Sequence, residues 1–357
     1  MPEATIIVED LPVVFRYEDT GPPGGSSTYT TVVLVHGLIF HGRTFKRMSP
    51  YAASHNLRFI SVNMRDYPGS SAYTPSELQM LANPEYEAQE AAVLQRGNEI
   101  ATFLKYVIEH ERIPAFEERE GARTGGIALL TWSMGNVFSM TLLGNIDSLG
   151  EETRSLLHRY LRSVVIYDTP YVVVGAVPPE GIYHPLSDRA VPLERRPHHF
   201  MTWVSTYYEP VDDISSMDLS VLAKRRAMHD ISNAHETKPL IDRMSVEDIE
   251  DTTDPAAFYR SGMHFRNIPR EIYWSNVQRA LFDTKGSFAH VDTLVLWCDM
   301  SPTISLWAAK SLHERLVSAQ GEDKKARKVK LLKLEHANHF VHWEEPERMV
   351  RVLVEHL

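Results

Sequence analysis

Three features that would each assign a chain to a narrow class are scarce in this sequence of 357 residues. Cysteine occurs once, as Cys298, which excludes an internal disulfide and a thiolate metal cluster and favours a reducing compartment. Basic residues are in deficit, with 37 lysines and arginines against 47 aspartates and glutamates and a net charge of −10. That charge argues against nucleic acid or an anionic membrane as the main partner.

Long hydrophobic runs are the third scarcity. No apolar stretch reaches the length needed to cross a bilayer, and the opening residues MPEATIIVED combine neither a basic segment nor a long apolar one. We therefore expect a cytoplasmic protein that does not associate with membranes. The sequence does not indicate an oligomeric state.

What the sequence does contain is an alternation of apolar strands and amphipathic helices. Hydrophobic residues make up 43% of the chain, enough for a substantial core. Period and turn signals predict strands at Thr5–Val8, Pro12–Tyr17, Thr30–His36, Arg58–Asn63, Ile127–Leu130, Leu161–Tyr167, Val291–Trp297 and Val329–Leu334. The predicted helices are Glu87–Glu109, Asn136–Leu143, Ile304–Val317 and Pro346–Leu357. A solvated loop is expected over Gln320–Lys328. The pattern predicts an α/β chain.

The alternation stops between Tyr171 and about His290, where proline, histidine, methionine, aromatic and charged residues become common. We expect a largely helical insertion there, including a helix over Leu219–His229 and a solvated acidic surface over Val246–Asp254. Its methionines and aromatic residues either line a substrate cavity or pack against one another. The predicted division is a core of residues 1–171 and 290–357 with a cap of residues 172–289.

Ser133 lies at the end of the apolar run Ile127–Leu130, in the sequence TWSMG. A serine on a sharp strand-to-helix turn needs small neighbours, because the backbone is strained and the strand and helix approach closely. Gly135 is one such neighbour, and Thr131 stands where glycine is usual. The helix expected from Met134 onward would direct its first N–H groups toward a developing oxyanion. The same residues are also compatible with an ordinary turn.

A second strand exit supplies a further candidate. Thr30–His36 ends in His36-Gly37, and the following loop could direct a backbone N–H, that of Leu38, into the same site. Leu38 and Met134 are therefore the predicted oxyanion-hole residues.

Together, these motifs resemble the α/β-hydrolase superfamily. The resemblance is carried by LVHG at 34–37, RDYPGSS at 65–71, TWSMGN at 131–136 and ANHFVHWEEPE at 337–347, in the family's order. It implies a mostly parallel central sheet flanked by helices, with a cap insertion. The insertion and YDTP at Tyr167–Pro170 are also similar to hydrolases encoded with fungal polyketide and polyketide–peptide pathways.

The resemblance implies that His339 is the base that activates Ser133, because the loop after the last strand reaches over the nucleophile. His336 and His342 flank it. A metal site is not favoured, because only Glu335 and Glu344 could add ligands in this loop. We expect no cofactor and no metal.

The third catalytic residue should be a carboxylate that orients His339. Many relatives carry the acid four residues after the position of Trp297, but that position is Ser301 here. Asp168, at the end of the strand after the nucleophile helix, matches the position used by other relatives, including the polyketide-pathway group. Asp168 is the preferred candidate and Asp299 the alternative. The unused aspartate would form a turn or cap a helix.

The resulting hypothesis is a serine hydrolase that cleaves an ester or thioester of a small hydrophobic, polyketide-type acyl substrate. Dehalogenases and epoxide hydrolases of the same fold use an aspartate nucleophile, and Ser133 argues against them. Two alternatives remain open: an acyl-enzyme that is resolved by cyclisation or acyl transfer, and a catalytically silent binding protein.

Overall fold

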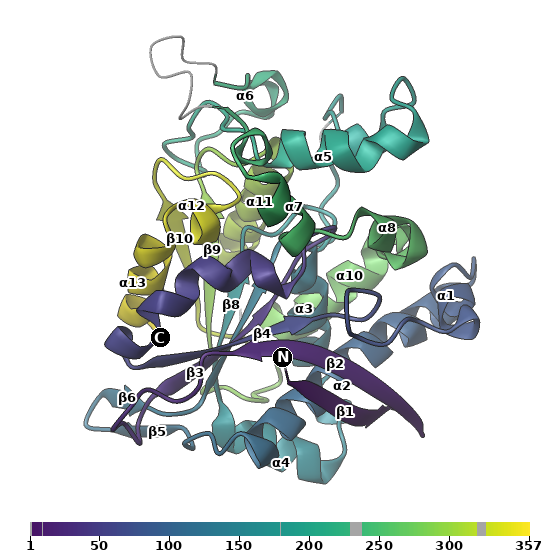
Figure 1. The fold of residues 1–357 in the computed structure, drawn as a ribbon. Coiled ribbons are helices and arrows are strands. Elements are labelled where there is room, and N and C mark those ends of the chain that lie inside the picture. The colour runs from purple at the N-terminus through teal and green to yellow at the C-terminus, as the bar shows by residue number, and fades with distance from the viewer. Residues whose placement is uncertain (1, 9, 179, 229–237, 320–325) are drawn as a thin grey trace.

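The computed structural model of the protein describes residues 2–8, 10–178, 180–228, 238–319 and 326–357. Its central element is an eight-stranded sheet with the order β1-β2-β4-β3-β7-β8-β9-β10 (Figure 1). The pairs from β4 to β10 are parallel, whereas β1–β2 and β2–β4 are antiparallel. The strands are β1 (Glu3–Val8), β2 (Leu11–Asp19), β3 (Thr30–Val35), β4 (Leu57–Asn63), β7 (Ile127–Trp132), β8 (Leu161–Tyr167), β9 (Asp292–Cys298) and β10 (Val329–Leu334). A short hairpin, β5 (Glu117–Arg119) and β6 (Ala122–Thr124), stands apart from this sheet.

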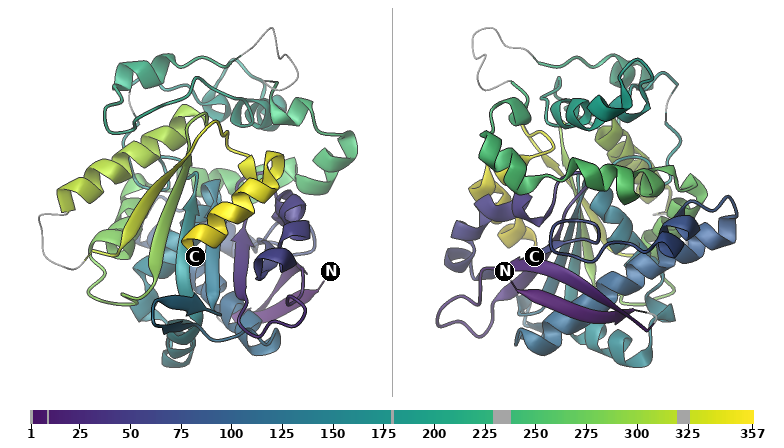
Figure 2. Two further views of the ribbon diagram at one scale, coloured as in Figure 1. Left: turned by 90° about the vertical axis from the view of Figure 1, so that its left-hand side faces the viewer. Right: turned by 45° about the vertical axis from the view of Figure 1, so that its right-hand side comes forward.

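Alternate residues of the central strands face two separate hydrophobic cores. Val33 and Val35 of β3 belong to one core, and Val32 and Leu34 belong to the other. Helices cover both faces of the sheet (Figure 2). The first core is completed by α2 (Tyr86–His110), α3 (Asn136–Gly144) and α11 (Thr303–Ala319), and the second by the 3-10 segment η1 (Gly42–Tyr51), α12 (Val341–Glu344) and α13 (Pro346–His356). Because both faces are buried, the strands read as continuous apolar runs. The predicted α/β fold with a mostly parallel sheet is confirmed.

The chain between β8 and β9 supplies the predominantly helical segments drawn above the carboxyl ends of the central strands (Figure 1). They include α5 (Arg196–Val204), α6 (Leu219–Lys224), α7 (Val246–Thr252), α8 (Pro255–Ala257) and α9 (Met263–Asn267). By contrast, α10 (Arg270–Val277) and the π-helical turn η9 (Gln278–Phe282) pack against α3 beside the sheet. The predicted division at 172 and 289 stays a prediction.

Two expected segments need qualification. The predicted helix over Leu219–His229 is α6 only as far as Lys224, and its last residue lies outside the described residues. Most of the expected loop over Gln320–Lys328 also lies outside them. Among the described helices, none is long and apolar enough to cross a bilayer.

A buried charge cluster joins α2 to the loop after β4 and to α1 (Pro75–Leu81). Glu99 is fully buried; its Oε1 lies 2.7 Å from Arg65 Nη1 and 3.3 Å from Arg96 Nη2. Arg65 also pairs with Glu77. Removing one of these charges is expected to destabilise the fold, because its partners would stay buried without an opposite charge beside them.

Glu99→Ala is therefore expected to reduce the free energy of unfolding by about 3–5 kcal/mol. Glu109→Ala, on the same helix but at an exposed Lys105 pair, should change it by less than about 0.5 kcal/mol. Urea denaturation followed by circular dichroism measures both. Equal stability of the two variants would show that the buried cluster does not hold the two helices to the loop.

Candidate active site

Ser133 adopts a strained backbone conformation between β7 and α3. Its φ angle is +55°, in the left-handed region that residues with a side chain rarely occupy. A short 3-10 turn, Ser133–Gly135, precedes α3, which begins at Asn136. The expected helix start at Met134 is thus replaced by a tighter turn. Strain of this kind is typical of functional sites, where it costs on the order of 1–3 kcal/mol.

The turn is fixed by a close approach of two backbones. A Cβ atom added to Gly135 would lie 2.3 Å from the carbonyl oxygen of His36, and one added to Gly37 would lie 2.8 Å from Ser133 Cβ. Neither position could hold a side chain without moving the backbone. Two motifs separated by about a hundred residues in the sequence therefore meet at these two glycines.

Thr131, which replaces the usual glycine, has a role that the sequence did not reveal. Its hydroxyl donates to Asn136 Oδ1 at 2.7 Å. The Asn136 amide nitrogen in turn donates to the carbonyl oxygens of Ser133 at 2.8 Å and Tyr167 at 3.2 Å. The side chains of Thr131 and Asn136 therefore stabilise the turn through hydrogen bonds.

The predicted oxyanion-hole residues surround the same space as the serine. Leu38, Ser133 and Met134 all line one cavity. Within the described chain, the backbone amide of Leu38 has no hydrogen-bond acceptor. An amide left open beside a cavity is available to a ligand oxygen.

His339 and Asp168 form the shortest contact of this region. His339 Nδ1 lies 2.5 Å from Asp168 Oδ2, and both side chains are buried. Asp168 accepts two further hydrogen bonds, from Ser301 Oγ at 2.6 Å and from the Cys298 amide at 3.2 Å. Its own φ angle is +45°. The carboxylate is thus held from several sides, and Ser301, at the position where many relatives carry the acid, serves as one of its donors.

Asp299 contacts the same loop at a different point. Its Oδ1 accepts from the Ala337 amide at 3.1 Å, and its carbonyl accepts from the Val211 amide at 3.1 Å. It therefore holds the backbone that carries His339, while Asp168 contacts the imidazole itself.

The backbone of His339 is fixed by two aromatic donors. Its carbonyl oxygen accepts from Trp132 Nε1 at 3.0 Å and from Tyr167 Oη at 3.2 Å. The neighbouring His342 is fully buried between Thr44 and Tyr167, and burial lowers its pKa well below the ordinary value. His342 packs locally, and His336 is exposed. In the described part of the chain, no three histidine, cysteine or acidic side chains are placed to hold a metal ion.

The cavity that contains Ser133 lies between the strand ends and the cap and has a volume of about 250 Å³. Most of its lining residues are apolar. Its apolar lining residues are Leu38, Met134, Pro170, Val172, Leu186, Phe200, Val204 and Ile304, and its polar ones are Ser133, Tyr171, His184, Arg266 and Asn267. Of the aromatic residues and methionines of the insertion, Phe200 reaches the cavity, whereas Met201 and Trp203 pack in the second core.

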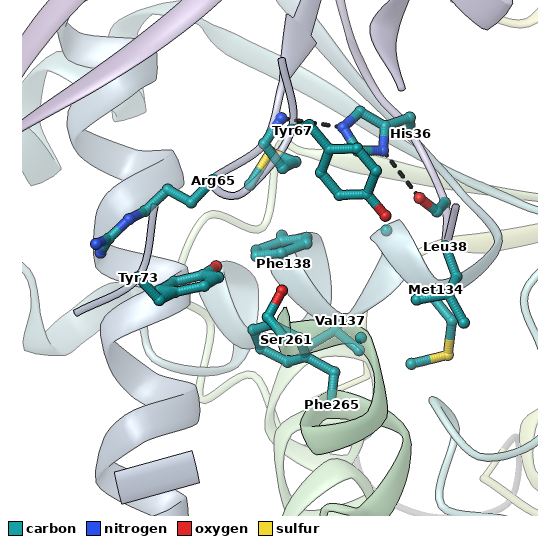
Figure 3. Close-up of a pocket in the computed structure, with 14 residues that line it drawn as sticks. His36, Leu38, Arg65, Tyr67, Tyr73, Met134, Val137, Phe138, Ser261 and Phe265 are labelled. Carbon is teal, nitrogen blue, oxygen red and sulfur yellow. Dashed lines mark hydrogen bonds between the residues drawn. The ribbon is translucent and has the colours of Figure 1, made fainter. Parts of the chain in front are cut away.

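A second, smaller cavity of about 40 Å³ shares Leu38 and Met134 with the main cavity (Figure 3). His36 forms part of its wall. His36 Nε2 accepts from the Met64 amide at 2.9 Å, so the proton resides on Nδ1, which donates to the Gly37 carbonyl at 2.8 Å. Burial lowers the pKa of His36 to about 3, which keeps the ring neutral and this pattern intact.

The comparisons with known proteins agree with this architecture. The model of the alpha/beta hydrolase family matches residues 32–352, so the chain belongs to that family and is an α/β-hydrolase enzyme. No curated protein matches the sequence. Among solved structures, an N-acyl homoserine lactone degrading enzyme is similar with a TM-score of 0.52, 11% identity and coverage of 100% of each chain. Potato (Solanum tuberosum) epoxide hydrolase I is similar with a TM-score of 0.51, 13% identity and coverage of 99% of this chain and 98% of that one. At such identities the likeness concerns the fold.

The low pKa of His36 predicts a pH dependence of stability. The unfolded chain takes up a proton on this histidine below its ordinary pKa of 6.5, whereas the folded protein does so only near 3. The free energy of unfolding should therefore decrease as pH falls below about 6.5, by up to about 1.4 kcal/mol per pH unit from this group.

His36→Gln keeps an acceptor for the Met64 amide and does not titrate. Urea denaturation at pH 7.5, 6.5 and 5.5 should give a shallower pH slope for this variant than for the wild type. The matched control is His336→Gln at an exposed position, which should keep the wild-type slope. If His36→Gln also keeps it, His36 is not neutral in the folded protein.

Proposed function

We propose that the protein is a serine hydrolase that cleaves an ester or thioester through Ser133, His339 and Asp168. The observation that carries the proposal is the contact between His339 Nδ1 and Asp168 Oδ2, in the loop next to the nucleophile turn. A carboxylate on Nδ1 fixes the tautomer in which Nε2 is free to accept a proton. Trp132, next to Ser133 in the chain, donates to the carbonyl of His339 and supports the position of the ring.

The reaction begins when Nε2 of His339 takes the hydroxyl proton of Ser133, whose oxygen attacks the acyl carbon. The carbonyl oxygen becomes an oxyanion, and the backbone amides of Leu38 and Met134 donate to it. Each such donor contributes about 3–4 kcal/mol to transition-state stabilisation. The imidazolium, stabilised by Asp168, then protonates the leaving group. Water activated by the same histidine releases the acyl group from Ser133.

Two observations support a small hydrophobic acyl substrate. The cavity of about 250 Å³ is smaller than most drug-sized sites and is largely apolar. In addition, Asp168, which contacts His339, belongs to the YDTP sequence on which the polyketide-pathway resemblance rests. We extend the proposal to a polyketide-type ester or thioester on these grounds. Ser133 argues against the epoxide-hydrolase and dehalogenase reactions of the same fold, which use an aspartate nucleophile.

Covalent labelling tests the nucleophile. A fluorophosphonate should attach to Ser133 in the wild-type protein, as peptide mapping would establish, and Ser133→Ala should abolish labelling. The same variant should lower kcat on a 4-nitrophenyl ester on the order of 10⁶-fold. Ser261→Ala, a serine in the wall of the second cavity, is the control and should label normally. A folded wild-type protein that hydrolyses no ester and takes no label would favour the catalytically silent binding protein.

The assignment of the acid is tested by comparing Asp168→Asn with Asp299→Asn. Loss of the carboxylate on His339 should lower kcat roughly 10⁴-fold. Asp299→Asn keeps an oxygen that can accept from the Ala337 amide, so its activity should stay close to that of the wild type. Steady-state kinetics on one ester, with circular dichroism to confirm folding, distinguishes the two. A larger loss in Asp299→Asn would reverse the assignment.

A further inference from the structure

The wall of the main cavity contains a cation without an acidic partner. Arg266, on α9, is half-buried and lines the same cavity as Ser133. Its Nη2 donates to Ser187 Oγ. Within the described chain, no carboxylate lies within ion-pair distance of its guanidinium, and no acceptor contacts its Nε or Nη1. The Nε and Nη1 donors of this cavity-lining side chain are therefore available to a ligand.

Neighbouring arginines of the insertion show the contrast. Arg243 pairs with Glu344, Arg260 with Asp254 at 2.8 Å, and Arg270 with Glu271 at 2.8 Å. Burial lowers the pKa of Arg266; Tyr171 opposes this shift, and another cation, Arg196, adds to it. The chain has a net charge of −10, so a shortage of acidic residues does not explain why Arg266 has no carboxylate partner among the described residues.

A second donor stands close to Arg266. His184 Nδ1 accepts from the Leu186 amide at 3.2 Å, which leaves the proton on Nε2. Burial, with a further contribution from Arg266, lowers the pKa of His184 to about 3, so the ring is a neutral donor. None of the described residues that line the cavity is acidic. The polar lining groups thus include a positive charge and several hydrogen-bond donors, and none of them is a carboxylate.

We propose that Arg266 binds a carboxylate carried by the substrate at the end remote from the bond that is cleaved. The guanidinium matches a planar carboxylate in two parallel hydrogen bonds, and these are strong in a partly desolvated site. The substrate class is then an ester or thioester with a free carboxylate on its acyl or alcohol part. This inference rests on the proposed function of Ser133.

Two 4-nitrophenyl esters of equal shape test it: the hydrogen glutarate, which ends in a carboxylate, and the 5-methylhexanoate, which ends in an isopropyl group. Arg266→Gln should raise KM for the glutarate ester by about ten- to a hundred-fold and leave kinetics on the neutral ester nearly unchanged. Arg266→Lys keeps the positive charge but cannot form two parallel hydrogen bonds. Its KM for the glutarate ester should therefore lie between those of the wild type and Arg266→Gln. The matched control is Arg270→Gln, three residues past α9, which should behave as the wild type with both esters.

Binding separates a failure of this inference from a failure of the proposed function. Monomethyl glutarate should bind to Ser133→Ala by calorimetry, and Arg266→Gln should abolish that binding. If it binds in this way but the wild type hydrolyses neither ester, the hydrolase proposal is wrong and the carboxylate site stands. Three results would each overturn the carboxylate site. The first is an equal change of KM for both esters, and the second is no binding of monomethyl glutarate. The third is inhibition of glutarate-ester hydrolysis by inorganic phosphate but not by glutarate.

Discussion

The backbone contact between Gly135 and the carbonyl of His36 determines how the rest of the site is built. A Cβ atom added to Gly135 would lie only 2.3 Å from the carbonyl oxygen of His36. This approach, which no residue with a side chain could make, brings the carboxyl ends of β3 and β7 together. Because β3 and β7 are adjacent parallel strands, their carboxyl ends reach the same edge of the sheet. Leu38 and Ser133 therefore lie at one cavity, whose remaining walls come largely from the insertion. The positive φ of Ser133 is maintained by the same contact and by Asn136 beneath it.

Backbone and side-chain hydrogen bonds together hold the loop with His339, and Asn338 Nδ2 donates to the Ser205 carbonyl and to Glu344 Oε1. Asp299 accepts from Ala337, and Trp132 and Tyr167 donate to the carbonyl of His339. The imidazole contacts Asp168 through Nδ1 and packs against the rings of Trp132 and Phe340. Asp168 thus fixes the orientation of the His339 ring, and Nε2 stays free. Asp168 and Asp299 are both buried because one contacts the ring and the other contacts the backbone of the same loop.

The sequence predicted the sheet well, because strands buried on both faces read as uninterrupted apolar runs such as Leu161–Tyr167. Ser133 and His339 were also accessible to prediction, since each belongs to a motif with glycine or loop constraints. The choice between Asp168 and Asp299 was only partly accessible. Both follow adjacent parallel strands, β8 and β9, and which one meets the imidazole depends on side-chain directions that no periodicity encodes. Arg266 was missed because the insertion has no regular pattern, and an unpaired charge becomes visible only when its neighbours are known.

Leu38 and Met134 line both the main cavity and the smaller one. The side chain of Leu38 also packs against Gly262 of the insertion, where an added Cβ would lie 2.5 Å from Leu38 Cδ1. The side chains of these two residues are apolar and flexible, whereas the groups proposed to hold an oxyanion are their backbone amides. The space open to an acyl chain can therefore change with the size of these side chains, while the backbone donors stay in place.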